Sequence, residues 1–364
     1  MDYEQMINDQ LADLDLAELE DIMQDAADQS NGIFEALTTE DIIDSLISGE
    51  SLFNTDLILE NVKDVLFMEV KAGILMGVEI LTVCIIMGLL NNITESFGNK
   101  AASTLGNTVC SCLVIILCLT NFKLTYNACS GTLDTMTNTM QILLPILIPL
   151  LIGIGGFSSG SILNPVIISA VTGFNTVLQT FILPLVFISG TFILLNSLTE
   201  KSYLQQMAVF LRKAAIYTTG LIVTIFAGIT AIQGIVTKSA DGLLVNTARY
   251  SISNFVPIVG KFASDSVDMV LSCAAIIKNS IGLLGIIMIL CLLSGPILKL
   301  IAVAIIYKIT AIFAEPISTK QVSSTLAEMG SSVVTMTVVL GLSALMFLIF
   351  LTIIISIGGG TLWK

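Results

Sequence analysis

Long apolar runs separated by short polar segments dominate the chain after about residue 70. Because a helix needs about 20 mostly apolar residues to cross the hydrocarbon core of a bilayer, each such run predicts a membrane span. The clear spans are Ala72–Leu90, Val109–Thr120 extended back towards Ala101, Met140–Gly156, Val177–Leu198, Ala214–Ile235, Ile281–Tyr307 and Val334–Ile357. Two proline-containing regions, 161–198 and 268–314, are each too long for one span and short for two. The pattern predicts an all-α bundle with about seven to nine spans.

The first 55 residues alternate between polar and apolar positions at helical spacing. Asp15 and Glu18 have the spacing of a capping box, and one stripe of the helix that follows holds Leu16, Leu19, Ile22, Met23 and Ala26. A second helix is predicted from Thr39 to near Gly49. We therefore expect a soluble helical arm over 1–55, an amphipathic helix at the membrane interface over 56–71, and a transmembrane domain over 72–364.

Composition supports a membrane body and separates the arm from it. Only 12% of the 364 residues are charged and the mean hydropathy is +0.94, whereas a soluble domain has roughly 25% charged residues. Residues 1–64 hold 18 of the 28 acidic residues and one base, Lys63. The remaining residues hold 14 bases and 10 acids. The arm's charge disfavours nucleic acid as a partner, and it suits either simple solvation or a basic partner protein.

The residue types needed for most catalysis are missing or misplaced. The chain has no histidine, which excludes histidine-dependent triads and H-E-x-x-H zinc sites, and it has no phosphate-binding P-loop motif. The acidic residues that remain near the spans are in or beside predicted loops: Asp134, Asp241, Asp265 and Asp268. Six of the seven cysteines lie in or beside apolar runs, and Cys129 lies in a predicted loop. We expect no enzymatic activity, no cofactor and no metal site.

Four ionisable residues lie in or beside apolar stretches: Glu79, Lys278, Lys299 and Lys308. A charge at the centre of a membrane helix costs roughly 2.5–3.5 kcal/mol, so such groups usually face a bundle interior, a partner or water. One hypothesis pairs Glu79 with Lys308 or Lys278 between helices. The alternative is that Glu79 extends to the interface and that the lysines mark helix ends.

Gly156 and Gly160 form a G-x-x-x-G pair within a glycine- and serine-rich segment. Such a pair allows two membrane helices to approach closely. Because several glycines together weaken a helix, a turn between spans explains the same segment.

Residues 236–279 predict two amphipathic helices joined by a turn at Pro257-Ile258-Val259-Gly260. Arg249, Asn254 and Phe255 precede this turn. A hairpin of this kind could enter the membrane and line a water-filled passage, where it would act as a gate or a partner contact. The alternative, which the pattern alone favours, is a hairpin that lies flat in the headgroup region.

At this hairpin the sequence resembles the stage III sporulation protein AE family. The most specific segment is N-F-x-P-x-x-G, which includes Asn254, Phe255, Pro257 and Gly260. Other matching segments are Ala240-Asp241-Gly242, Thr247–Tyr250, Asp265–Asp268, Ile276–Asn279, Tyr307-Lys308 and the stretch from Leu204 to Arg212. The similarity extends in order from about residue 70 to the C-terminus, whereas the arm matches only in general character.

The resemblance implies a polytopic protein of endospore-forming bacteria, located in the mother-cell membrane around the forespore. It implies membership of a secretion-like complex that bridges two membranes, with a separate ATPase and ring-forming subunits, so other subunits, membrane lipid and homo- or hetero-oligomers are the expected partners. It also implies an arm between the two membranes after removal of a signal sequence. The acidic first residues show no such sequence, so the side of the membrane on which the arm lies is left open.

Three functions fit these observations. The first is a membrane subunit of a transenvelope sporulation channel, forming part of its export gate. The second is a self-contained secondary transporter with discontinuous helices near Pro165, Pro184 and Pro296, although no internal repeat is evident. The third is a membrane scaffold that anchors ring proteins through its arm.

Overall fold

The computed structural model describes residues 17–34, 38–48, 55–96, 100–154, 169–198, 203–255 and 259–356. These residues form helices and no strand, which confirms the all-α class. The elements are α2 (Ala17–Gln29), α3 (Thr39–Ser48), α4 (Thr55–Ser96), α5 (Lys100–Gly153), η1 (Leu178–Ile182), α7 (Leu183–Asn196), α8 (Tyr203–Phe255), α9 (Val259–Ala314) and α10 (Lys320–Ser356).

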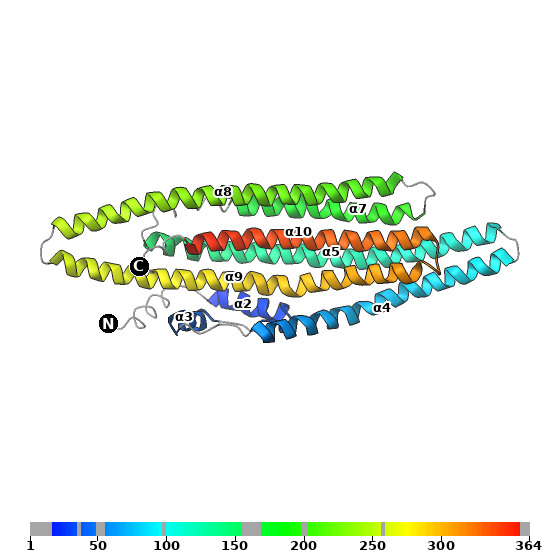
Figure 1. Ribbon diagram of the computed structural model, residues 1–364, viewed down its shortest axis with the longest axis horizontal. Coiled ribbons are helices and arrows are strands. Elements are labelled where there is room, and N and C mark those ends of the chain that lie inside the picture. Colours follow the sequence, from blue (N-terminus) through cyan, green and yellow to red (C-terminus); the bar gives the residue numbers. More distant parts are fainter. Residues whose placement is uncertain are drawn as a thin grey trace.

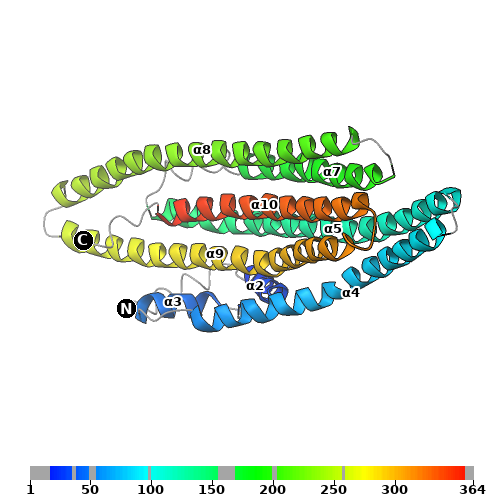
Figure 2. The same cartoon turned by 45° about the vertical axis from the view of Figure 1, so that its right-hand side comes forward.

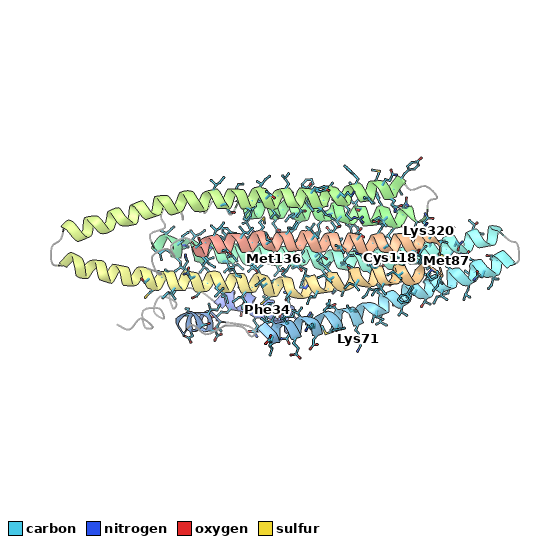
Figure 3. The ribbon with its side chains drawn as sticks, viewed as in Figure 1. Phe34, Lys71, Met87, Cys118, Met136 and Lys320 are labelled. Atoms are coloured by element: carbon cyan, nitrogen blue, oxygen red, sulfur yellow. The ribbon has the colours of Figure 1, made fainter. Side chains whose placement is uncertain are left out.

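The long helices lie side by side in an elongated bundle (Figures 1 and 2). α5, α9 and α10 form its centre, with α7 and α8 on one side and α2, α3 and α4 on the other. α5 and α10 run in the same direction, because Cys129 of α5 meets Met336 of α10 and, about fifteen residues later on both helices, Leu143 and Leu351 lie beside the same glycine of α9, Gly285. Buried residues such as Cys118 and Met136 lie inside this bundle, whereas Lys71 is exposed on α4 (Figure 3).

Six helices in the described part of the chain are long and apolar enough to cross a membrane, as expected of an integral membrane protein. They are Asp56–Thr94, Thr104–Gly153, Ser169–Asn196, Tyr203–Ile232, Ser272–Ala314 and Lys320–Ser356. This number is one below the predicted range of seven to nine. The difference arises because α5 contains two of the predicted spans.

The predicted loop between those two spans is wrong. α5 continues as a helix through its polar segment, and Cys129 is fully buried with its Sγ 3.9 Å from the carbonyl oxygen of Met336. Threonine hydroxyls along this segment donate to carbonyl oxygens four residues earlier, as Thr125 and Thr132 do at 2.8 and 2.9 Å. Because the helix itself satisfies these hydroxyls, a threonine-rich segment needs no loop.

α4 is continuous from Thr55 to Ser96 and has no turn between residues 56–71 and the apolar stretch that follows. Val65, in its first half, packs with Leu298 of α9 and with Ile33 of the arm. The expected interfacial helix is therefore the first half of a long helix that lies along the bundle. Burial of its apolar stripe against α9 explains why it does not turn away.

The prolines interrupt the helices less than expected. Pro296 lies inside α9, which continues to Ala314. Before Pro184 the chain forms the π-helical turn η1, in which the N–H of Leu183 donates to the carbonyl oxygen of Leu178. Pro165 lies outside the described residues, as do Gly156 and Gly160. The discontinuous helices of the transporter hypothesis are thus absent at Pro296.

Candidate functional site

Lys278 is a fully buried cation of α9. Its Nζ donates to the carbonyl oxygens of Ile354 and Ile355, each at 3.1 Å. Both carbonyls belong to the last turn of α10, where they lack partners within the helix and carry the negative end of its dipole. Lys278 therefore joins α9 to the C-terminal end of α10.

Glu79 is not brought to either lysine. It is exposed on α4, whose opposite stripe, including Ile80 and Cys84, is buried. Gly77 contacts Thr310 of α9, and a residue two positions further is about 200° around the helix. Glu79 therefore points away from α9 and from both lysines. Its side chain forms no ion pair with a described residue, and a position at the membrane interface stays a prediction.

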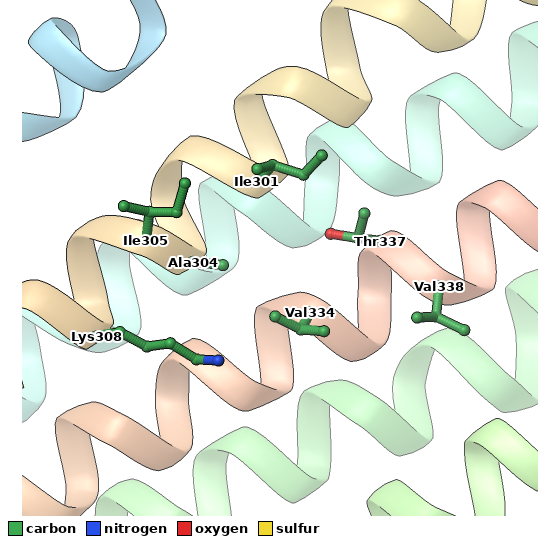
Figure 4. Close-up of a pocket in the computed structure, with 7 residues that line it drawn as sticks. All are labelled: Ile301, Ala304, Ile305, Lys308, Val334, Thr337 and Val338. Atoms are coloured by element: carbon green, nitrogen blue, oxygen red, sulfur yellow. The ribbon is translucent and has the colours of Figure 1, made fainter. Parts of the chain in front are cut away.

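Lys308 points towards α10 instead of α4. Its stem packs against Gly330, and its side chain lines a pocket between α9 and α10 (Figure 4). Lys278 and Lys308 both lie inside α9, which spans Val259–Ala314, and a place for either lysine at the end of a membrane span stays a prediction.

The ion pair among the described side chains joins Arg212 of α8 to Glu328 of α10 at 2.7 Å. Arg212 Nη1 also donates to the carbonyl oxygen of Glu328 at 3.4 Å. This pair was missed from sequence, although Glu328 is the last charged residue before a long uncharged run that begins at Met329. The contact places the starts of the uncharged stretches of α8 and α10 at one level of the bundle.

α5 exposes a polar stripe that begins near this level and extends deeper along the bundle. The stripe consists of Lys123, Asn127, Asp134 and Asn138, whose spacing of four, seven and four residues places them on one helix face. Gln179 of η1 donates to Asp134 Oδ1 at 2.7 Å. Because Cys129 meets Met336 and the two helices are parallel, Asp134 is level with the middle of the uncharged run of α10.

The acidic arm packs on α9 at this same level. Leu19, Met23 and Ala26 of α2 are buried in the main core, and the carbonyl oxygen of Gln29 lies directly against Gly295. The outer face of α2 is exposed and carries Asp21, Asp25 and Asp28.

The level of this contact follows from a neighbouring one. Ile297, two residues after Gly295, lies against Gly341 of α10. Gly341 is twelve residues into the uncharged run, or about 18 Å along the helix. The bundle is therefore acidic on the α2 side and uncharged along α10 at the same height.

The predicted hairpin is formed by direct extensions of α8 and α9. α8 ends at Phe255 and α9 starts at Val259, so the backbones of Arg249, Asn254 and Gly260 are helical, while Pro257 lies outside the described residues. Lys278 is level with the end of α10, and α9 begins nineteen residues earlier, about 28 Å further out.

The hairpin thus projects beyond α10 along the bundle axis and neither folds back nor lies flat (Figure 1). The structure does not describe the side chains of residues 233–271. A role of this hairpin as a gate or partner contact stays a prediction.

Comparison with known proteins gives consistent results. The family model described as stage III sporulation protein AE matches residues 37–358. Stage III sporulation protein AE of Bacillus subtilis (strain 168) is 31% identical over 319 residues, which cover 87% of this chain and 79% of that protein. No solved structure matches the chain. Because the match extends over nearly the whole membrane bundle, the chain belongs to the stage III sporulation protein AE family.

Proposed function

We propose that the chain is a membrane subunit of a channel or secretion-like complex that links mother cell and forespore during sporulation. In this proposal it lies in the mother-cell membrane around the forespore, forms part of an export gate, and has other complex subunits and bilayer lipid as partners. It carries out no chemical reaction of its own. Membership of a sporulation family supports a function in sporulation. The surface of the bundle, which is acidic along α2 and uncharged along α10, supports a role as one subunit of a larger assembly.

The observation that carries the proposal is the acidic face of α2 beside the uncharged stretch of α10. A bilayer that surrounded the whole bundle at this height would place Asp21, Asp25 and Asp28 in hydrocarbon. Ionised groups at that depth are costly and normally face water or protein. One side of the bundle therefore suits lipid, and the other suits an aqueous passage or a neighbouring subunit.

The α5 stripe adds a second polar surface at this height. Asn127, Asp134 and Asn138 are exposed in the single chain, whereas a self-contained transporter encloses its intramembrane polar groups around a central substrate site. Polar surfaces left open at membrane depth are expected of a subunit that is completed by assembly.

Imaging of the purified particle in lipid nanodiscs tests the proposal. We expect several copies, or several different subunits, around a continuous opening. α2 and the first half of α4 should face the opening or another subunit. A monomer with a closed cavity at its midplane would support a transporter and contradict the proposal.

Thiol labelling tests the two-sided surface separately. Single cysteines at Asp25 and Asp134 should react with a membrane-impermeant maleimide, whereas cysteines at Leu221 and Ile225, which are exposed apolar positions of α8, should stay unreactive. The parent chain sets the background from its own cysteines. Equal labelling on both sides would show that the whole bundle meets the same environment, and the proposed division would be wrong.

A further inference from the structure

A pocket of about 160 Å³ lies between α9 and α10. Its lining residues are Ile301, Ala304, Ile305, Lys308, Val334, Thr337 and Val338 (Figure 4). Apart from the Lys308 ammonium and the Thr337 hydroxyl, these walls are aliphatic. Ile305, Val334 and Val338 are each more than a third exposed, so the pocket is open to the outside of the bundle.

Lys308 lies beside the level at which α8 and α10 change from charged to uncharged. Its stem contacts Gly330, two residues after Glu328, which pairs with Arg212. Beyond this pair, α10 has no charged residue from Met329 onwards within the helix, and α8 has none from Ala214 to Ile232. Such a change on adjacent membrane helices is typical of the border between headgroups and hydrocarbon.

The pocket extends from Lys308 into the uncharged zone. Ile301 is seven residues earlier on α9, and Val338 is eight residues beyond Gly330 on α10, so the cleft follows the helices for about 10 Å. Lys308 forms no ion pair or hydrogen bond with the described residues. The pocket therefore offers an unpaired cation at the border and an aliphatic cleft below it.

We infer that this pocket binds one anionic glycerophospholipid, with the phosphate on Lys308 and an acyl chain in the cleft between α9 and α10. A hydrocarbon chain needs no polar partner, which fits the aliphatic walls, and a negative headgroup complements the ammonium. A zwitterionic headgroup has less net attraction for the same cation. A partner helix in this cleft would need a carboxylate next to Lys308.

Native mass spectrometry of the full chain in detergent tests the site. After incubation with phosphatidylglycerol or phosphatidylcholine, the parent protein should retain phosphatidylglycerol in preference. Lys308→Gln should retain about fivefold less, since one cation at an anionic surface has about that effect, and Lys308→Arg should retain it. Lys213→Gln is the matched control, because Lys213 is an exposed lysine at the same border on α8. Inorganic phosphate at equal concentration should not displace the lipid.

Val338→Trp gives an independent test, because it fills the cleft and leaves Lys308 in place. It should lower retention of phosphatidylglycerol, whereas Ile225→Trp on exposed α8 should not. Unchanged retention in both Lys308→Gln and Val338→Trp, or an equal loss in Lys213→Gln, would overturn the site. A photo-reactive residue at Val338 that cross-links to protein and not to lipid in membranes would also overturn it.

Discussion

The ammonium of Lys278 lies 3.1 Å from the carbonyl oxygen of Ile354, 76 positions later in the chain. Because Lys278 also bonds the carbonyl oxygen of Ile355, one cation of α9 supplies the C-terminal cap of α10. The contact lies where the α8–α9 extension leaves the rest of the bundle. The capping role explains how a lysine can be fully buried without the Glu79 partner that the sequence suggested.

Replacing Lys278 by methionine should loosen the last turn of α10. The change keeps an unbranched stem and removes the charged hydrogen bonds, which are worth about 1.5–3 kcal/mol, while loss of a buried charge offsets part of that cost. We expect faster hydrogen exchange over 353–356 and a smaller change in the overall melting temperature. Lys299→Met, at an exposed position of the same helix, should not affect that turn. Unchanged exchange at the end of α10 would contradict the capping role.

The Arg212–Glu328 pair should behave as a coupled unit. Its side chains are 14% and 27% exposed, so the attraction is screened less than at an open surface, and we expect a coupling free energy of about 1 kcal/mol. Arg212→Glu and Glu328→Arg should each lower the melting temperature of the purified protein. The double reversal should recover much of the loss. If the double variant loses as much stability as the two single variants lose together, the pair contributes nothing.

Apolar run length was sufficient to predict the class of fold. Its predictions at 72–90, 177–198 and 334–357 fall on α4, on η1 with α7, and on α10, because no other signal competes with about 20 apolar residues in sequence. It failed at α5, where Asn121, Thr125 and Thr132 lower the hydropathy of the segment but bond their own helix. A hydropathy value reflects the polarity of a side chain, but it does not reflect which group accepts the hydrogen bond of that side chain.

The candidate sites were harder to predict because they depend on which helices are adjacent. Lys278 and Lys308 were found as ions in apolar runs, but their environments come from Ile354 and Gly330 of α10, which are remote in sequence. Glu79 has the same sequence signature and is exposed. A charge in a span therefore identifies a position of interest, whereas its partner follows only from the packing.

Low pH should weaken the start of α3. Thr38 and Asp41 form a reciprocal cap: Thr38 N–H and Oγ1 donate to Asp41 Oδ2 at 2.8 and 2.7 Å, and Asp41 N–H donates to Thr38 Oγ1 at 3.2 Å. The hydrogen bonds from Thr38 lower the pKa of Asp41 below 3.8, and the bond from the Thr38 backbone has a larger effect than the bond from the Thr38 side chain.

A lowered folded-state pKa gives stability that is present above the unfolded value and is lost as pH falls through the folded value. Once intrinsic rates are corrected, hydrogen exchange of α3 should therefore be independent of pH from neutral pH down to about 4, and it should rise below that as Asp41 is protonated. Asp41→Asn should raise exchange already at neutral pH and remove the additional acid sensitivity. An acid response identical in parent and variant would show that another group is responsible.

Gly295 should control whether the acidic arm stays on α9. The carbonyl oxygen of Gln29 lies so close to Gly295 that a side chain there would collide with backbone, which cannot move as a flexible side chain can. Overpacking of this kind costs about 1–3 kcal/mol, so Gly295→Ala should raise the population of the detached arm about fivefold or more. Limited proteolysis within α2 should accelerate accordingly, while α9 and α10 stay protected. Gly228→Ala is the control, because no atom lies within 4 Å of the added carbon. Unchanged proteolysis of α2 would show that its contact with Gly295 does not hold the arm. If detachment also abolished assembly of the complex while the membrane bundle stayed folded, the docked arm would be a determinant of assembly.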